Sequence, residues 1–94
     1  MTPSGKLPQQ DPHRLRDTSE KNLETAIGRE VRAFRKNQSI TVADLSTATG
    51  ISIGMLSKIE NGNTSPSLTT LRTLAHALSV PLTAFFRGFE ESRI

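Results

Sequence analysis

The chain has 94 residues, with twelve Lys and Arg against nine Asp and Glu, which gives a formal net charge of +3. This length allows one domain with a single modest core. Cysteine is absent, which excludes a disulfide framework and a thiolate metal site. The small positive charge favours a nucleic-acid partner only weakly, because phosphate binding depends on local clusters of Lys and Arg.

The apolar residues also argue against a membrane protein. The sequence contains no run of about 18 apolar residues, the length that a spanning helix needs. Residues 1–10 are polar and contain proline, unlike the apolar stretch of a signal peptide. We therefore expect a cytoplasmic protein.

The large apolar residues are concentrated in one part of the chain. Leu7 and Leu15 are the only Leu, Ile, Val or Phe among the first 22 residues. Such a segment cannot bury enough apolar surface to offset the entropy lost on ordering. The sequence thus predicts a flexible tail over residues 1–21, one domain over 22–90, and a short C-terminal tail over 91–94.

The first predicted helix carries one apolar stripe, since Leu23, Ile27, Val31 and Phe34 recur at spacings of four, four and three. Its other face is basic. The polar residues 37–39 then interrupt the pattern, and we expect the helix to end there.

Two short helices follow, each with its own end signals. Thr41 is a suitable N-cap for the second helix, and a carboxylate at Asp44 suits its first turn. Gly50 ends this helix, where a left-handed residue is needed. Ser52 caps a third helix that is expected to run to Asn61. Its inward residues are Ile51, Leu56 and Ile59.

The last part of the domain is also predicted to be helical. Ser67 caps a fourth helix, and Pro81 can open a short fifth helix. No segment shows convincing strand alternation. The expected fold is all-α, a compact bundle of five short helices. The apolar stripe of the fourth helix comprises Leu68, Leu71, Leu74, Ala75 and Leu78.

Only Gly50 and Ile51 separate the second helix from the third. A connection this short makes the two helices cross at a steep angle and leaves the third one projecting. Its outward positions are unusual for a helix surface, because they include an exposed Ile53 and a glycine, Gly54, that costs about 1 kcal/mol relative to Ala in a helix interior.

At this point the sequence resembles a known family, the lambda-repressor-like (Cro or XRE) helix-turn-helix domains. The resemblance covers about residues 23–87. Members are sequence-specific transcriptional regulators, mostly repressors, that bind operators as dimers. The motifs that carry it are Ile27-Gly28-Arg29-Glu30-Val31-Arg32, Phe34-Arg35, Ile40-Thr41-Val42, Leu56-Ser57-Lys58-Ile59-Glu60-Asn61-Gly62 and Pro66-Ser67-Leu68 onward to Leu78.

The resemblance implies a role for each matching position, with the third helix in the major groove. Lys58 can donate to guanine, Ile53 can pack on a thymine methyl, and Gly54 lets the helix lie close to a base pair. The implied base-facing residues are Ser52, Ile53, Gly54, Ser57 and Lys58. The residues implied to hold the sugar-phosphate backbone are Thr41, Val42, Asn61, Asn63, Thr64 and Ser67.

Two positions depart from the family pattern. Val42 stands where the family often has Gln, so its side chain cannot donate a hydrogen bond. Ser46 stands where Ala is usual, at the tightest helix crossing, and we expect its hydroxyl to bond a carbonyl one turn back. Arg35 and Glu60 match a pair that joins the first helix to the end of the third.

Plainer interpretations remain open for several residues. Ser57 and Lys58 taken alone are ordinary solvated surface, although the helix-turn-helix context favours DNA contact. Ile53 fits a base contact and a peripheral core or interface residue equally well. A charged helix face is the commoner explanation of the remaining basic residues, which are not counted in the site: Arg29, Arg32, Lys36, Arg72 and Arg87.

Nothing in the sequence favours catalysis or a cofactor. His13 and His76 have no second His at ligand spacing, no catalytic triad has supporting context, and no glycine-rich loop suggests phosphate transfer. We expect neither an enzyme nor a bound metal. Phe85 is assigned to the core, whereas Phe86 and Phe89 fit either the core or a dimer contact.

The predicted function is therefore sequence-specific binding of double-stranded DNA by a transcription regulator, most simply a repressor. The resemblance implies that the regulator is a homodimer. The main alternative is a protein-interaction module of the same fold, antitoxin- or coactivator-like, with Ile53, Met55 and the C-terminal Phe residues as its contact patch. RNA binding is weaker, because no Tyr or Trp is present for stacking.

Many proteins that resemble this chain carry a C-terminal ligand-sensing domain, often a cupin barrel. A small-molecule effector is expected only if such a domain exists outside this chain. A stand-alone regulator and the DNA-binding part of a longer one both fit the sequence.

Overall fold

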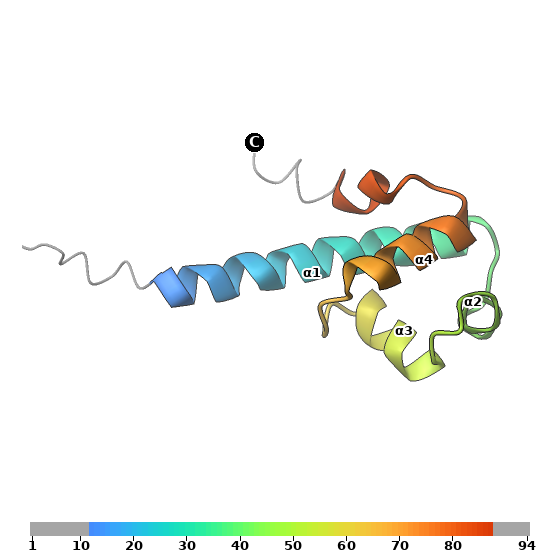
Figure 1. Ribbon diagram of the computed structural model, residues 1–94, viewed down its shortest axis with the longest axis horizontal. Coiled ribbons are helices and arrows are strands. Elements are labelled where there is room, and N and C mark those ends of the chain that lie inside the picture. Colours follow the sequence, from blue (N-terminus) through green and yellow to red (C-terminus); the bar gives the residue numbers. More distant parts are fainter. Residues whose placement is uncertain (1–11, 88–94) are drawn as a thin grey trace, which may run out of the picture.

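A computed structural model describes the backbone of residues 12–87 and the side chains of residues 22–87. The regular elements in this part of the chain are all helices and none is a strand, which confirms the predicted all-α class. The described residues form four α-helices and one 3₁₀-helix, where five helices were predicted; Figure 1 shows their arrangement. In chain order they are α1 (Pro12–Asn37), α2 (Val42–Thr49), α3 (Ile53–Glu60), α4 (Leu68–Leu78) and η2 (Leu82–Phe86).

The first helix differs most from its prediction, because α1 has 26 residues and begins at Pro12 rather than near Leu23. Residues 12–21, assigned from the sequence to a tail, thus have a helical backbone. An existing helix can extend without a new nucleation step, and no Gly or Pro interrupts residues 13–22. Burial alone therefore does not decide where this helix begins. Residues 1–11 and 88–94, with Phe89 and the predicted tail 91–94, lie outside the described residues.

The predicted fifth helix is a 3₁₀-helix of five residues, η2, rather than an α-helix. Short apolar segments often take this tighter form. Phe85 on η2 is fully buried, as predicted, and Phe86 is partly buried against the core. The ring of Phe85 meets that of Phe34 edge to face, with 6.2 Å between the centroids. This contact fixes η2 against α1.

The predicted helix starts are confirmed by their hydrogen bonds. The hydroxyls of Thr41, Ser52 and Ser67 each accept a bond from the backbone N–H three residues later, at the start of α2, α3 and α4. Each cap satisfies an amide that the first helical turn leaves unpaired. The third helix ends at Glu60, one residue before the predicted end, and Asn61 caps it.

The core lies between α1 and the helices around it. Figure 1 shows η2 on one side of α1 and α3 on the other, with α4 alongside. Side chains from all five elements close a single apolar interior, so that each short helix is held by burial rather than by its own propensity. The buried apolar residues are Ile27, Val31, Leu45, Leu56, Ile59, Leu71, Leu74, Ala75, Leu78 and Phe85.

The backbones of α1 and α3 touch at Gly28. A Cβ atom placed on this glycine would lie 2.7 Å from the carbonyl oxygen of Glu60, and it would also collide with the carbonyl oxygen of Ile59. Both obstacles are backbone atoms that cannot move aside. The end of α3 is therefore seated directly on α1.

Candidate nucleic-acid interface

The corner between α2 and α3 is built by Gly50 and Ile51. Gly50 has a φ of 78°, in the left-handed region that glycine adopts without strain, and its N–H donates to the Ser46 carbonyl. The backbone thus leaves α2 and enters α3 within three residues, Gly50, Ile51 and the N-cap Ser52. The predicted steep corner is present.

The hydroxyl of Ser46 stabilises this corner with a hydrogen bond across the turn. Ser46 Oγ donates to the carbonyl of Ile51, at 2.6 Å. The expectation that Ser46 bonds back along its own helix is therefore wrong. The turn brings the Ile51 carbonyl within reach of the Ser46 hydroxyl, whereas Thr47 and Thr49 of the same helix do donate to carbonyls one turn back. Thr49 adds a second tie, since its Oγ1 accepts from the Ile51 N–H at 3.1 Å.

The helix α3 has two contrasting faces. On the inner face, Leu56 and Ile59 are completely covered, with 0% and 1% of their surfaces exposed. On the two flanks of α3, Ile53 and Met55 are 52% and 41% exposed, which is unusual for large apolar side chains. A helix anchored on one side and open on the other can present its outer side to a partner.

Sequence-predicted base-facing residues all lie on the exposed part of α3 or at its N-cap. The Ser52 hydroxyl is engaged in capping, with the Met55 N–H as its donor at 3.1 Å. The structure brings the five together on one short helix: Ser52, Ile53, Gly54, Ser57 and Lys58 are all exposed.

The predicted backbone-holding residues lie at helix ends and in the α3–α4 loop. The Thr41 and Ser67 hydroxyls are already used as caps, although each keeps a second lone pair. Val42 and Thr64 are half-buried, which leaves them less accessible than the others. The exposed members of the set are Thr41, Asn61, Asn63 and Ser67.

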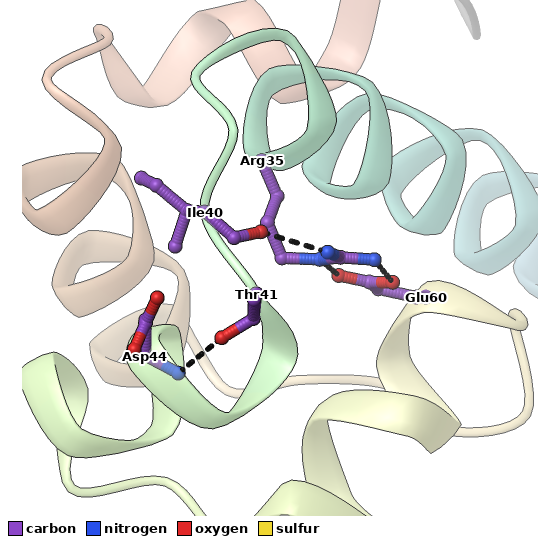
Figure 2. A network of polar contacts seen from close by, with 5 residues as sticks. All are labelled: Arg35, Ile40, Thr41, Asp44 and Glu60. Atoms are coloured by element: carbon purple, nitrogen blue, oxygen red, sulfur yellow. Dashed lines mark hydrogen bonds and ion pairs between the residues drawn. The ribbon is translucent and has the colours of Figure 1, made fainter.

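Arg35 and Glu60 form the contact that the resemblance implied (Figure 2). Arg35 Nε donates to Glu60 Oε2 at 2.6 Å, and Nη2 donates to Oε1 at 3.0 Å. The same guanidinium donates through Nη1 to the Ile40 carbonyl at 2.9 Å. The side chains are 10% and 6% exposed. One residue thus joins α1, the turn before α2 and the end of α3.

The protonation of Arg35 follows from this geometry. Hydrogen bonding to the Glu60 carboxylate raises the pKa of Arg35 above its ordinary value; burial acts in the opposite direction, and charge attraction reinforces the increase. Because the pKa of Arg35 is raised, the stability that its charge contributes is fully present at neutral pH and is lost as the pH rises into strong alkali. The bidentate geometry is the stronger form of such a pair.

A surface pocket of about 340 Å³ opens where α1, α2 and α3 meet. The Arg35 charge is balanced there by Glu60, which leaves Arg32 as the uncompensated charge among the lining residues. The sequence analysis assigned Arg32 to a solvated face. Its spacing of three from Arg35 was the available signal, because residues three apart share a helix face. The pocket is lined by Arg32, Arg35, Val42, Ser57, Glu60 and Asn61.

The loop after α3 is also held by α1. Gly62, with a φ of 73°, packs so closely on Thr25 that an added Cβ would lie 3.0 Å from the Thr25 Cα. Ser65 donates a hydrogen bond to the Glu24 carboxylate. These contacts fix the loop that carries Asn63 relative to α1.

Two further features bear on the kind of site. Within residues 12–87, no helix has the length and apolar character needed to cross a bilayer. Among the same residues, no group of three or more His, Cys, Asp or Glu is placed to hold a metal ion.

The chain matches the family model described as helix-turn-helix over residues 31–85, which contain α2, α3 and α4 entirely. The chain belongs to the Cro/XRE-type helix-turn-helix family. This confirms the resemblance found in the sequence. The match also covers the corner at Gly50 and the outer face of α3.

Relatives of known name share this domain. The chain is 39% identical over 57 residues to the HTH-type transcriptional repressor RghR of Bacillus subtilis, covering 60% of this chain and 42% of that protein. It is 39% identical over 61 residues to the HTH-type transcriptional regulator SlrR of the same organism, covering 64% and 40%. The chain therefore spans about two fifths of the length of these relatives.

Two solved structures of transcription regulators superimpose on most of this chain. The clp gene regulator ClgR of Corynebacterium glutamicum superimposes with a TM-score of 0.70 at 29% identity, covering 77% of this chain and 94% of that one. An HTH_3 family transcriptional regulator from Vibrio cholerae gives a TM-score of 0.69 at 29% identity, covering 73% and 39%. The similarity extends over most of the described helices.

Proposed function

We propose that this protein is a transcription regulator that binds double-stranded DNA by sequence, with α3 docked in the major groove. The observation that carries this proposal is the contrast between the two faces of α3. Its inner face is fixed by Leu56, Ile59 and the Gly28 contact, while its outer face is exposed. An α-helix fits the major groove of B-form DNA. The names of the relatives favour regulation, and RghR favours repression.

In the proposed complex, the outer face of α3 carries the base contacts. Lys58 donates to guanine O6 or N7, and the Ser57 hydroxyl bonds a base or a phosphate. Ile53 and Gly54 provide apolar contact. Ser52 caps α3 and contributes with its remaining lone pair or through its hydroxyl proton.

Residues around α3 hold the sugar-phosphate backbone and set the position of the helix without selecting sequence. Val42 takes part through its backbone N–H at the positive end of α2. We add Arg32 to this set, because it brings a positive charge to the pocket between α1 and α3. The proposed backbone contacts are Thr41, Val42, Asn61, Asn63, Thr64, Ser67 and Arg32.

A homodimer would place two copies of α3 about one helical turn apart, near 34 Å. One module of this size buries only about 600–1,000 Å² on DNA. A second copy would therefore raise the affinity for a two-fold symmetric operator. We propose a cytoplasmic, dimeric regulator whose response to any small molecule would depend on a domain outside these residues.

A protein-interaction role is the second candidate, favoured by the exposure of Ile53 and Met55 on α3. In that role the same face would bury apolar side chains against a protein. The two candidates differ in their response to salt, since phosphate contacts release counterions and an apolar protein interface does not.

Selection of bound sequences from a random duplex pool tests the proposal. We expect an enriched motif, and an affinity for it that falls linearly on a plot of log K against log salt. Scrambled duplexes of the same length should bind at least 10³-fold more weakly. Recovery of no motif, together with binding that is insensitive to salt, would contradict DNA recognition and favour the protein-interaction role.

A further inference from the structure

An Asn–Gly pair, Asn61–Gly62, directly follows α3. Because glycine has no side chain to shield its backbone nitrogen, the Gly62 nitrogen can attack Cγ of Asn61 and expel the side-chain nitrogen as ammonia. The product is a cyclic succinimide. Water then opens the ring at Cγ to give aspartate, or at the backbone carbonyl to give isoaspartate. The net reaction consumes one water molecule and releases one ammonia molecule.

The folded structure holds this pair away from the geometry of ring closure. Asn61 has a ψ of 1°. Ring closure needs the Gly62 nitrogen to be nearly eclipsed with Cβ of Asn61 about the Cα–C bond. Tetrahedral geometry at Cα places these two atoms about 120° apart when ψ is near zero. The peptide group between Asn61 and Gly62 must therefore rotate widely before the nitrogen can reach Cγ.

Hydrogen bonds and packing oppose this rotation. The N–H of Gly62 donates to the Ile59 carbonyl at 3.1 Å, and the N–H of Asn63 donates to the Lys58 carbonyl at 2.8 Å. Gly62 is buried, and a Cβ added to it would lie 3.0 Å from the Thr25 Cα. Turning the peptide group would break the Gly62 bond and move this residue away from α1. The reaction therefore requires local opening of the loop after α3.

The product would lie where the proposed complex meets the DNA backbone. Asn61 is exposed and lines the same pocket as Arg32. Aspartate at this position adds a negative charge that repels a phosphate and offsets the charge of Arg32. Isoaspartate adds one backbone atom between residues 61 and 62, which would displace Gly62 from Thr25. Both products should weaken the contact with DNA.

We propose that Asn61–Gly62 is a deamidation site which the packing of Gly62 on α1 keeps unreactive in the folded protein, and that its product weakens DNA binding by the loop after α3. The effect on DNA rests on the proposed function, whereas the protection by the fold does not. The Gly62 amide must lose its proton to attack, so the rate in the unfolded chain should rise with pH.

The rates of deamidation in the folded and the unfolded chain test the protection. The full chain is incubated in buffer and in guanidinium chloride, and peptide mass spectrometry follows each asparagine. In guanidinium chloride Asn61 should react first, because the other three asparagines, Asn22, Asn37 and Asn63, precede residues with side chains. Folding should slow the reaction of Asn61 by about tenfold or more, since it then requires local opening.

Ser65→Ala loosens the loop without changing the reacting pair. The variant removes the hydrogen bond to the Glu24 carboxylate. Asn61 should then deamidate about two- to tenfold faster in the folded chain, as for loss of one hydrogen bond, and at an unchanged rate in guanidinium chloride. Thr47→Ala is the control, because it removes a hydroxyl that bonds the Ala43 carbonyl within α2. Its folded rate should equal that of the wild type.

A second arm measures the effect of the product on DNA binding. Asn61→Asp carries the charge of the aspartate product, and Asn61→Gln keeps a neutral amide. On the selected duplex, Asn61→Asp should bind about five- to tenfold more weakly than Asn61→Gln, as for one like charge close to a phosphate at the surface.

The outcomes separate this inference from the proposed function. An Asn61 that reacts no faster than Asn22 in guanidinium chloride would overturn the site. Equal rates at Asn61 in buffer and in guanidinium chloride would overturn the protection, as would a Ser65→Ala variant that reacts no faster than the wild type when folded. Equal binding of Asn61→Asp and Asn61→Gln to a selected duplex would overturn the effect on DNA and leave the proposed function standing. If no duplex is selected, the proposed function fails together with the effect on DNA, while the rates still decide the protection.

Discussion

Gly28 and Gly54 are glycines in neighbouring helices, yet their surroundings are opposite. A Cβ on Gly28 would lie 2.7 Å from the Glu60 carbonyl oxygen, whereas a Cβ on Gly54 meets nothing within 4 Å. The first position is determined by contacts within the chain. The second is open, so no contact among the described residues requires glycine there.

The same division holds for the whole of α3. Substitutions on the side facing α1 should reduce the stability of the fold, and binding would then fall as a consequence. Substitutions on the outer side should change DNA binding at nearly constant stability. This separation makes the two roles experimentally distinct.

On the inner side, Glu60→Ala should have the largest effect. It removes the partner of Arg35, and an ion pair with both side chains at least 90% covered costs about 3–5 kcal/mol when broken on one side. We expect a value near 3 kcal/mol, since Arg35 keeps its bond to the Ile40 carbonyl. Urea unfolding measures the loss, and DNA titration should show weaker operator binding.

Glu30→Ala is the matched control, since it removes the same charge from α1 and should change stability far less. If Glu60→Ala leaves both the melting temperature and operator binding unchanged, the Arg35–Glu60 pair has no role in holding α3.

Gly28→Ala should come next. The new Cβ forces α1 and α3 apart, and overpacking of this kind costs about 1–3 kcal/mol. In a domain of this size, each kcal/mol of lost stability lowers the melting temperature by about 4–8 °C. Gly54→Ala adds the same methyl group to the other face and serves as the control. Equal melting temperatures for the two variants would contradict the claim that Gly28 is closely packed and Gly54 is open.

On the outer side, Lys58→Ala should leave the melting temperature unchanged, because Lys58 is exposed. If its ammonium grips guanine, binding should weaken by about 1–3 kcal/mol and base preference should relax at one operator position. Selection repeated with the variant shows which position relaxes. Equal weakening on every sequence would assign Lys58 to a phosphate instead.

The smallest effect should come from Arg32→Ala. Loss of one phosphate contact should weaken binding uniformly across sequences and reduce the slope of log K against log salt by about 0.9. Arg87→Ala removes the same charge at the end of η2, where Arg87 lies over the ring of Phe34. An equal change of slope in both variants would indicate a general charge effect rather than a contact in the pocket.

Much of the fold could be predicted from the sequence, because the residues that begin and end helices and the spacing of the apolar residues indicate the same helices. Thr41, Ser52 and Ser67 cap the helices as predicted, and Gly50 makes the corner. The early start of α1 was missed because helix extension does not need an apolar face. The 3₁₀ form of η2 depends on packing against α1, which periodicity does not reveal.

The site was less accessible to sequence reasoning. The Ser46 bond to Ile51 depends on where the turn places a carbonyl, and Arg32 depends on a pocket shared by three helices. Neither is a property of a single helix. The Arg35–Glu60 pair, separated by 25 positions, was identified through the family resemblance.

Chemical-shift mapping by NMR tests most directly whether the outer face of α3 meets DNA. The labelled protein is titrated with its selected duplex, and the backbone amide shifts are followed. We expect the largest changes over residues 52–58 and little change over residues 83–87, on the far side of α1. Large changes at 83–87 with none at 52–58 would contradict recognition through α3.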